Sequence, residues 1–283
     1  MMVRLCEKAL VLDIEPTYVR NLIRARSLTP RRDWVEGWPW RIKITTLGRF
    51  EILQDDTPYA PVLKPQRKVL DLLKALIALG GRDVNTNTLI ETLWPDLDGD
   101  AAQNNFKGCL HRLRKLLGHE AAILLQDGNL SINAVLCRVD IWAIDDLMEQ
   151  ISNCTPDTPR NELIEFSERL LQNYRSHFLM DETTVPHVLA TQDKMRSKFR
   201  RTVIKLGTLL EANDAWDQAI ETYQRALELD NLSESIYQRL ILCFKKHGND
   251  AEALNVYRRC RDMLSIVLGV SPSKETQALL AAR

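Results

Sequence analysis

The segment best suited to chemistry with a partner is a short cationic stretch. From 101 to 118 the sequence reads AAQNNFKGCLHRLRKLLG, which contains lysines and arginines but no acidic residue. Lysine and arginine neutralise phosphates, and arginine or asparagine can hydrogen-bond base edges in the major groove of DNA. The candidates for such contacts are Asn104, Asn105, Lys107, Gly108, His111, Arg112, Arg114 and Lys115. A charge run is more often only a solvated helix face, so the neighbouring elements must decide between the two interpretations.

The spacing of apolar residues predicts that this stretch is an amphipathic helix. Intervals of four, three and four residues place one set on a single helical face, namely Phe106, Leu110, Leu113 and Leu117. Gly108 lies on the opposite side, where it weakens the helix by roughly 1 kcal/mol relative to alanine. A glycine there would permit close approach of a DNA backbone or a thymine methyl. Asp98 and Asp100 stand near the helix start, where the helix dipole favours negative charge.

The elements around this helix predict how it is positioned. The alternating stretch RIKITTLGRFEIL predicts a strand of a small antiparallel sheet. The segment KPQRKVLDLLKALIALGG predicts a helix stopped by Gly80-Gly81, with a buried stripe of Val69, Leu72, Leu73, Leu76 and Ile77. A short helix follows, which Asn85 or Thr86 can cap and Pro95 ends.

A hairpin is predicted after the cationic helix. Two apolar runs flank Asp127-Gly128 in AILLQDGNLSI, which is the strongest hairpin signal in the chain. The order is therefore strands, three helices and a hairpin. This is the order of a winged helix, in which the third helix reads DNA and the hairpin is the wing.

The chain divides into three segments by pattern. Residues 1–40 form an N-terminal helical or linker segment, in which Pro16 can start a helix and LTPRRDWVEGWPW predicts a joint packed by aromatics. Residues 41–138 form the winged helix, and residues 139–283 form a helical domain. The arginines of the first segment are better explained as a solvated face than as a DNA arm: Arg20, Arg24, Arg26, Arg31 and Arg32.

An internal repeat characterises the third segment. Six positions recur 34 residues later, the period of a tetratricopeptide helix pair: Leu206, Leu210, Asp214, Ala219, Tyr223 and Ala226 are matched by Leu240, Phe244, Gly248, Ala253, Tyr257 and Cys260. Such repeats mostly bind proteins through a concave face. A basic run in one long helix is expected to be a solvated face: Lys194, Arg196, Lys198, Arg200 and Arg201.

Composition and missing motifs argue against other classes of protein. The 38 basic and 38 acidic residues balance, and no apolar run approaches the roughly 18 residues of a membrane helix. Six dispersed cysteines without a CxxC pair predict reduced, mostly buried thiols and a cytoplasmic protein without a signal peptide. GxxxxGK[ST], GxSxG, HExxH and spaced Cys/His sets are absent, so we expect no catalytic site, cofactor or metal.

Several stretches together resemble a known family. LGRFEI, PQRKVLDLLKALIALGGRDVNTNTLIETLWPD and the cationic helix resemble the OmpR-type winged helix of bacterial activators of the antibiotic-regulatory (SARP) kind. VDIWAIDDLMEQI and LGVSPSKET resemble the two ends of the bacterial transcriptional activator domain that follows it in those proteins. The resemblance implies a mainly α fold with small β: an OmpR-type winged helix-turn-helix and an all-α, tetratricopeptide-like repeat domain. It also implies that Ser271-Pro272 cap and start the last helix.

The resemblance assigns roles to the candidate residues. Asn104, Lys107, Gly108, His111 and Arg112 would lie nearest the base edges. Arg114 and Lys115 would lie on the phosphate side, joined by the amide end of the helix at Thr86 and the indole N–H of Trp94. Trp94 is equally compatible with a core aromatic. Asn129 stands where the family commonly has an aromatic, and residues 121–131 contain no lysine or arginine, which indicates a weak wing anchor.

The expected function is a sequence-specific, DNA-binding transcriptional activator in the bacterial cytoplasm, associated with the nucleoid. The resemblance implies binding to promoter DNA on direct repeats, as a homo-oligomer, with RNA polymerase or neighbouring protomers contacting the helical domain. Arg112→Ala should lose specific binding, whereas Arg114→Ala should weaken binding to all duplexes alike. The N-terminal segment is similar to linkers that follow large sensory regions, so the chain is expected to belong to something longer. The alternative is a tetratricopeptide adaptor whose winged helix binds protein.

Overall fold

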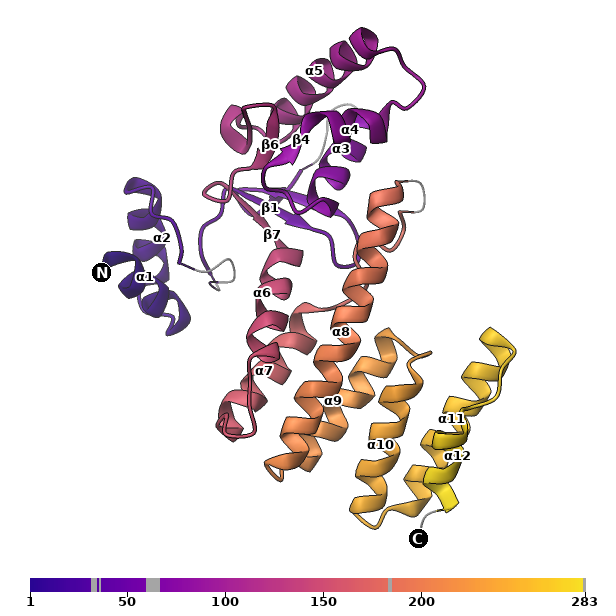
Figure 1. Ribbon diagram of the computed structural model, residues 1–283. Coiled ribbons are helices and arrows are strands. Elements are labelled where there is room, and N and C mark those ends of the chain that lie inside the picture. The colour runs from indigo at the N-terminus through magenta and orange to yellow at the C-terminus, as the bar shows by residue number, and fades with distance from the viewer. Residues whose placement is uncertain (32–34, 36, 60–66, 183–184, 282–283) are drawn as a thin grey trace. The chain divides into compact units, whose positions relative to one another are not determined.

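A computed structural model covers residues 1–283 and describes all of them except 32–34, 36, 60–66, 183–184 and 282–283. The chain forms two compact units (Figure 1). The first comprises residues 1–143 and 178–193, and the second comprises residues 144–177 and 194–283. Every strand within the described residues belongs to the first unit, whereas the second unit is helical.

The elements of the first unit are, in chain order, α1 (Met2–Val11), α2 (Pro16–Ala25), β1 (Ile42–Thr45), β2 (Glu51–Gln54), β3 (Thr57–Pro58), α3 (Arg67–Ala78), β4 (Val84–Asn85), α4 (Thr86–Leu93), α5 (Gly99–Leu116), the 3-10 turn η1 (Glu120–Ala122), β5 (Ile123–Gln126), β6 (Asn129–Ile132) and β7 (Cys137–Val139). The first residues of α6 (Asp140–Ser152) and α8 (Pro186–Ala212) also belong to it. The second unit adds α7 (Arg160–Asn173), α9 (Trp216–Leu229), α10 (Glu234–Lys246), α11 (Asp250–Leu268) and α12 (Lys274–Ala281).

The N-terminal helices α1 and α2 close a small core with the chain that follows them. Pro16 occupies the first turn of α2, as expected. The buried residues of this core are Cys6, Leu10, Val19, Ile23, Val35, Trp38 and Trp40. The ring centroids of Trp38 and Trp40 lie 6.4 Å apart, which confirms the aromatic joint for these two residues. Arg32 and Trp34, which were also part of that prediction, lie outside the described residues.

The predicted antiparallel sheet forms from β1, β2 and β3, but a fourth strand that was not predicted, β7, joins it in parallel. Its strand order is β3-β2-β1-β7, and β1 runs antiparallel to β2 but parallel to β7. In the parallel pair, Ile42 lies opposite Cys137 and Ile44 opposite Val139. A strand as short as β7 carries too little alternation to be recognised from sequence, and its partner lies far away along the chain.

Asp140 fixes the end of β1 to the start of α6. Its carboxylate accepts hydrogen bonds from the Thr46 amide at 2.8 and 2.9 Å, the Thr46 hydroxyl at 2.6 Å and the Leu47 amide at 2.9 Å. Residues 178–193 also contact the rest of the first unit, in part at the end of β1. The Leu179 amide donates to the Thr46 carbonyl at 2.7 Å, and Lys74 pairs with Glu182 at 2.7 Å. The first unit therefore needs residues from 178–193 as well as those up to 143.

The helices and hairpin of the winged helix form as predicted. The expected stripe of α3, from Val69 to Ile77, is buried, and the chain leaves the helix through Gly80 and Gly81 at positive φ. A Cβ on Gly81 would lie 2.4 Å from the Trp142 ring, so this position also needs a glycine for space. Asp127 and Gly128 have φ of 48° and 77°, as a type I′ hairpin turn requires. Strands β5 and β6 flank this turn, and β4 pairs with β6.

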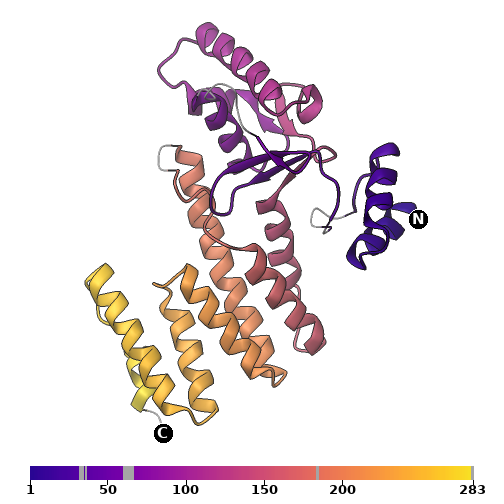
Figure 2. The ribbon, with the colours of Figure 1, turned by 180° about the vertical axis from the view of Figure 1, so that it is seen from behind.

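The second unit is a stack of antiparallel helices (Figures 1 and 2), and equivalent positions of the 34-residue repeat have similar backbone conformations in it. Helix α10 packs between α9 and α11. Asp214 and Gly248, which are equivalent in the repeat, both adopt left-handed backbone conformations, with φ of 53° and 69°. Tyr223 is fully buried and lies so close to Gly207 that a Cβ there would be 2.2 Å from its ring. The equivalent Tyr257 is only half-buried.

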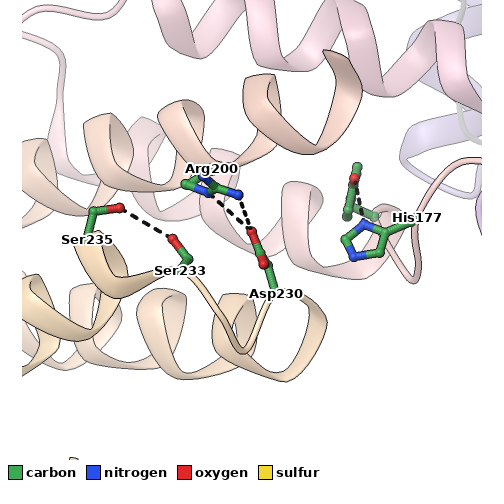
Figure 3. A network of polar contacts seen from close by, with 6 residues as sticks. His177, Arg200, Asp230, Ser233 and Ser235 are labelled. Atoms are coloured by element: carbon green, nitrogen blue, oxygen red, sulfur yellow. Dashed lines mark hydrogen bonds and ion pairs between the residues drawn. The ribbon is translucent and has the colours of Figure 1, made fainter. Parts of the chain in front are cut away.

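The basic run of α8 is only partly a solvated face. Arg200 donates from Nε and Nη2 to the buried Asp230 at 3.2 and 3.1 Å, as Figure 3 shows. Lys198 pairs with Asp145 of α6. Near this network the Tyr174 and Phe199 rings stack at 3.9 Å. The prediction of a solvated face is confirmed for three residues of the run that are exposed, Lys194, Arg196 and Arg201.

The stretch LGVSPSKET attaches α12 to α10. Gly269 ends α11 in a left-handed conformation, and Ser273 caps α12 by accepting the Thr276 amide at 3.3 Å. The expected cap at Ser271-Pro272 was therefore two residues too early. Glu234 of α10 accepts the Ser273 amide at 2.7 Å and the hydroxyl of Thr276. Burial alone would raise the pKa of Glu234, but these hydrogen bonds outweigh burial and lower the pKa.

Glu234→Gln is expected to destabilise the chain by roughly 1 kcal/mol near neutral pH, because hydrogen bonds to a charged acceptor are stronger than those to a neutral one. Since the folded-state pKa is lowered, the ionised carboxylate stabilises the fold above the pKa of the unfolded chain. That contribution disappears as pH falls through the folded-state pKa. Thermal unfolding of both proteins across this acid range should show the difference in Tm vanish. A difference that stays constant with pH would contradict the assignment.

Candidate nucleic-acid interface

Helix α5 presents one apolar and one cationic face, as its sequence predicted. It begins and ends two residues before the expected bounds, with Asp98 as N-cap and Asp100 in its first turn. Its buried residues are Ala102, Phe106, Cys109, Leu110, Leu113 and Leu116, and they pack on α3 and α4. Burial raises the pKa of the Cys109 thiol to about 11, and the thiol donates to the Lys68 carbonyl at 3.3 Å. This cysteine is therefore a neutral core residue.

The structure brings most of the predicted contact residues together on the side of α5 opposite its buried face. The exposed ones are Asn104, Asn105, Lys107, His111, Arg112 and Lys115, while Gly108 and Arg114 are half-buried. Successive members at three- or four-residue spacing lie above one another on the helix. After the first turn this surface carries no acidic residue, so it combines positive charge with amide and imidazole donors.

Arg112 covers the glycine of this surface. Its Nε donates to the Gly108 carbonyl at 3.0 Å, one turn earlier. A Cβ on Gly108 would meet only the Arg112 guanidinium, 3.5 Å away. The backbone at Gly108 is thus open to a ligand once the flexible arginine side chain moves.

Arg114 has a different environment from the one expected. Its Nε and Nη2 donate to the Ile123 carbonyl at 3.0 and 2.9 Å, and Glu120 lies 4.0 Å away. The guanidinium therefore fastens the end of α5 to the start of β5. Lys115, the other predicted phosphate residue, is exposed and has no ion-pair partner in the part of the chain that the structure describes.

Thr86 and Trp94 lie at the two ends of α4. The Thr86 amide and hydroxyl both donate to the Gly128 carbonyl, at 3.0 and 2.8 Å, and so hold the wing turn. Asn85 is the N-cap, because its side chain accepts the Asn87 amide at 2.9 Å. Trp94 follows the helix and is half-buried, with the Lys68 ammonium 6.0 Å from its ring centroid.

Comparison with known proteins places the chain in a family. The model of the bacterial transcriptional activator domain matches residues 139–282. The chain belongs to this family. It is also 24% identical over 218 residues to the regulatory protein AfsR of Streptomyces griseus. This alignment covers 76% of this chain and 22% of AfsR. The activator-family chain therefore spans about a fifth of the length of that relative.

A solved structure shares the fold of this activator-family chain. The structure described as Mycobacterium tuberculosis EmbR in complex with a low-affinity phosphopeptide aligns with a TM-score of 0.65 and 19% identity. The alignment covers 85% of this chain and 64% of the EmbR chain. Together with the family match and the AfsR similarity, it confirms the resemblance to SARP-type bacterial transcriptional activators.

Sequence reasoning missed one residue that positions the interface in this activator-family chain. Gln54 of β2 donates from Nε2 to the Leu116 carbonyl at 2.7 Å and so caps the end of α5. Next to it, Gly118 turns the chain with φ of 72°. The two partners of this hydrogen bond are 62 residues apart, so no local pattern could have revealed it.

Within the described residues, no helix is long and apolar enough to cross a membrane. The same part of the chain holds no group of three or more His, Cys, Asp or Glu side chains placed to bind a metal ion.

Gly108→Ala is expected to change stability and DNA binding in opposite directions. The added methyl fits the free protein and should stabilise α5 by roughly 0.5–1 kcal/mol. At a protein–DNA contact the same methyl would prevent close approach and weaken duplex binding. Thermal unfolding and a binding titration test the two effects, with Gly99→Ala in the same helix as control. Unchanged affinity of Gly108→Ala would place this part of α5 away from DNA.

Proposed function

We propose that this chain is a sequence-specific, DNA-binding transcriptional activator whose helix α5 enters the major groove. The observation that carries the proposal is the outer side of α5, which is free of acids beyond its first turn while the other side is the core of a winged helix. An α-helix fits the major groove, where each base pair presents a distinct pattern of donors and acceptors. The wing contains no lysine or arginine, so α5 carries most of the recognition.

The environments of the side chains divide the roles among them. Arg112, Lys107 and Asn104 read base edges, with Asn105 and His111 beside them and Gly108 allowing close approach. Lys115 contacts a phosphate. Arg114 holds α5 against the hairpin and Thr86 holds α4 against it, so both residues support DNA binding by positioning these helices. The indole N–H of half-buried Trp94 donates to the phosphate backbone of DNA.

The two functional parts are residues 41–138 and 139–283. Stacked helix pairs offer long surfaces for protein contacts, so the second part holds neighbouring protomers on direct repeats or contacts RNA polymerase. The activator acts on promoter DNA in the bacterial cytoplasm, associated with the nucleoid and without catalysis of its own.

Selection of duplexes from a random pool tests this proposal. We expect enrichment of a direct repeat, with binding that weakens steeply as salt rises because phosphate contacts release counterions. Retention of no duplex, together with salt-insensitive capture of a purified protein partner, would overturn it in favour of a tetratricopeptide adaptor.

A further inference from the structure

An open groove lies where α5 ends and η1 begins. Its volume is about 450 Å³, and it is lined by His111, Arg114, Lys115, Gly118, His119 and Glu120. The walls are held in place by the Arg114 bonds to Ile123 and by Asn133, which donates to the Ala121 carbonyl at 3.0 Å. The groove therefore exists before any ligand binds.

The hydrogen bond of His119 fixes which nitrogen carries its proton. Nδ1 accepts the Ala121 amide at 3.1 Å, and a ring nitrogen that accepts a hydrogen bond has no proton. The neutral imidazole therefore carries its hydrogen on Nε2. This N–H has no acceptor in the part of the chain that the structure describes, and the half-buried ring lines the groove.

The charges around the groove favour an anion. Arg114 already donates to the Ile123 carbonyl, whereas the ammonium of Lys115 is exposed and can pair with an anion in the groove. The one acid, Glu120, has a side chain that is 76% exposed, and it lies on the Arg114 side at 4.0 Å. A donor N–H and an ammonium at one groove suit a phosphate oxygen.

We propose that this groove binds one phosphodiester of the DNA strand beside the major groove, with Nε2–H of His119 as donor and Lys115 as countercharge. The inference rests on the proposed function and adds His119 to its residues. It adds a hydrogen-bond donor to the backbone contact of Lys115, whereas the wing has no lysine or arginine for such a contact.

The test compares His119→Ala, His119→Gln and Lys115→Ala on the selected duplex and on unrelated duplexes, at about pH 8. We expect His119→Ala to lower affinity for every duplex by roughly tenfold, without changing the slope of log K against log salt. Lys115→Ala should reduce that slope by about one. His119→Gln, whose amide can donate from a similar place, should recover most of the affinity. His247→Ala in the second unit is the matched control.

A direct readout separates loss of the contact from loss of folding. Nitrogen-15 NMR of the histidine rings should show His119 as the Nε2–H tautomer in the free chain and a shifted Nε2–H signal when duplex is added. Equal affinity of wild type and His119→Ala, or an unshifted signal, would overturn the inference while leaving DNA binding intact. A wild-type chain that binds no duplex would overturn the proposed function and this contact together. A shift caused by inorganic phosphate alone, without one from duplex, would assign the groove to a free anion and contradict the proposal.

Discussion

Arg112→Ala is expected to lower affinity for the selected duplex by roughly 10- to 100-fold, because an arginine–guanine pair contributes about 1–3 kcal/mol of base discrimination. Affinity for unrelated duplexes should fall much less, since only a general charge contact is lost there. The side chain is suited to this role because it is exposed and, among the residues that the structure describes, hydrogen-bonds only the Gly108 carbonyl. Exchanging that neutral acceptor for a base edge costs little.

The measurement is a pair of titrations with fluorescent duplexes at several salt concentrations. Arg201→Ala is the charge-matched control, since this exposed arginine lies in the second unit. Lys115→Ala should weaken both titrations by a similar factor. If Arg112→Ala also weakened both by one common factor, Arg112 would be a phosphate contact and the division of roles on α5 would be wrong.

Asp140→Ala is expected to destabilise the chain by about 3 kcal/mol. It removes an ionised acceptor shared by the Thr46 amide, the Thr46 hydroxyl and the Leu47 amide, and each hydrogen bond to a charged group contributes about 1.5–3 kcal/mol without full additivity. These donors lie in the interior of the unit, where Thr46 and Leu47 are buried, so they would lose their partner without gaining water.

Urea unfolding followed by circular dichroism and by tryptophan fluorescence measures this effect. Asp193→Ala, an exposed aspartate of α8 in the same unit, should change stability by less than about 0.5 kcal/mol. Asp140→Asn keeps the size but places an amide opposite backbone donors, so it should also be destabilising. A variant as stable as wild type would show that the carboxylate is dispensable for the join between β1 and α6.

Local patterns predicted helix α5 and the hairpin. The spacing of Phe106, Leu110 and Leu113 depends only on residues within α5. The turn of the hairpin depends only on the positive φ angles of Asp127 and Gly128. Neither depends on distant partners. The repeat was likewise readable, because Ala219 and Ala253 are small for the same packing reason in two successive helix pairs.

The features that the sequence did not predict depend on contacts between residues far apart in the chain. The resemblance placed Arg114 on the phosphate side, but the hydrogen bonds that its guanidinium donates to the Ile123 carbonyl could not be predicted, because no side-chain pattern reveals a backbone acceptor. The predicted boundary at residue 138 follows the change to helical periodicity. The first compact unit instead extends to residue 143 and also includes residues 178–193. Asp140 and Leu179 both hydrogen-bond Thr46 and so attach these segments to the winged helix.

The parallel pairing of β1 with β7 also constrains the order of events during synthesis. Thr46 and Asp140 are 94 residues apart, so one edge of β1 stays open until the whole of α5 and the hairpin have left the ribosome. An open strand edge is a template for pairing with other chains, and late non-local closure slows folding. Nascent chains released before residue 140 would therefore expose this edge, and aggregation should decline sharply once translation passes β7.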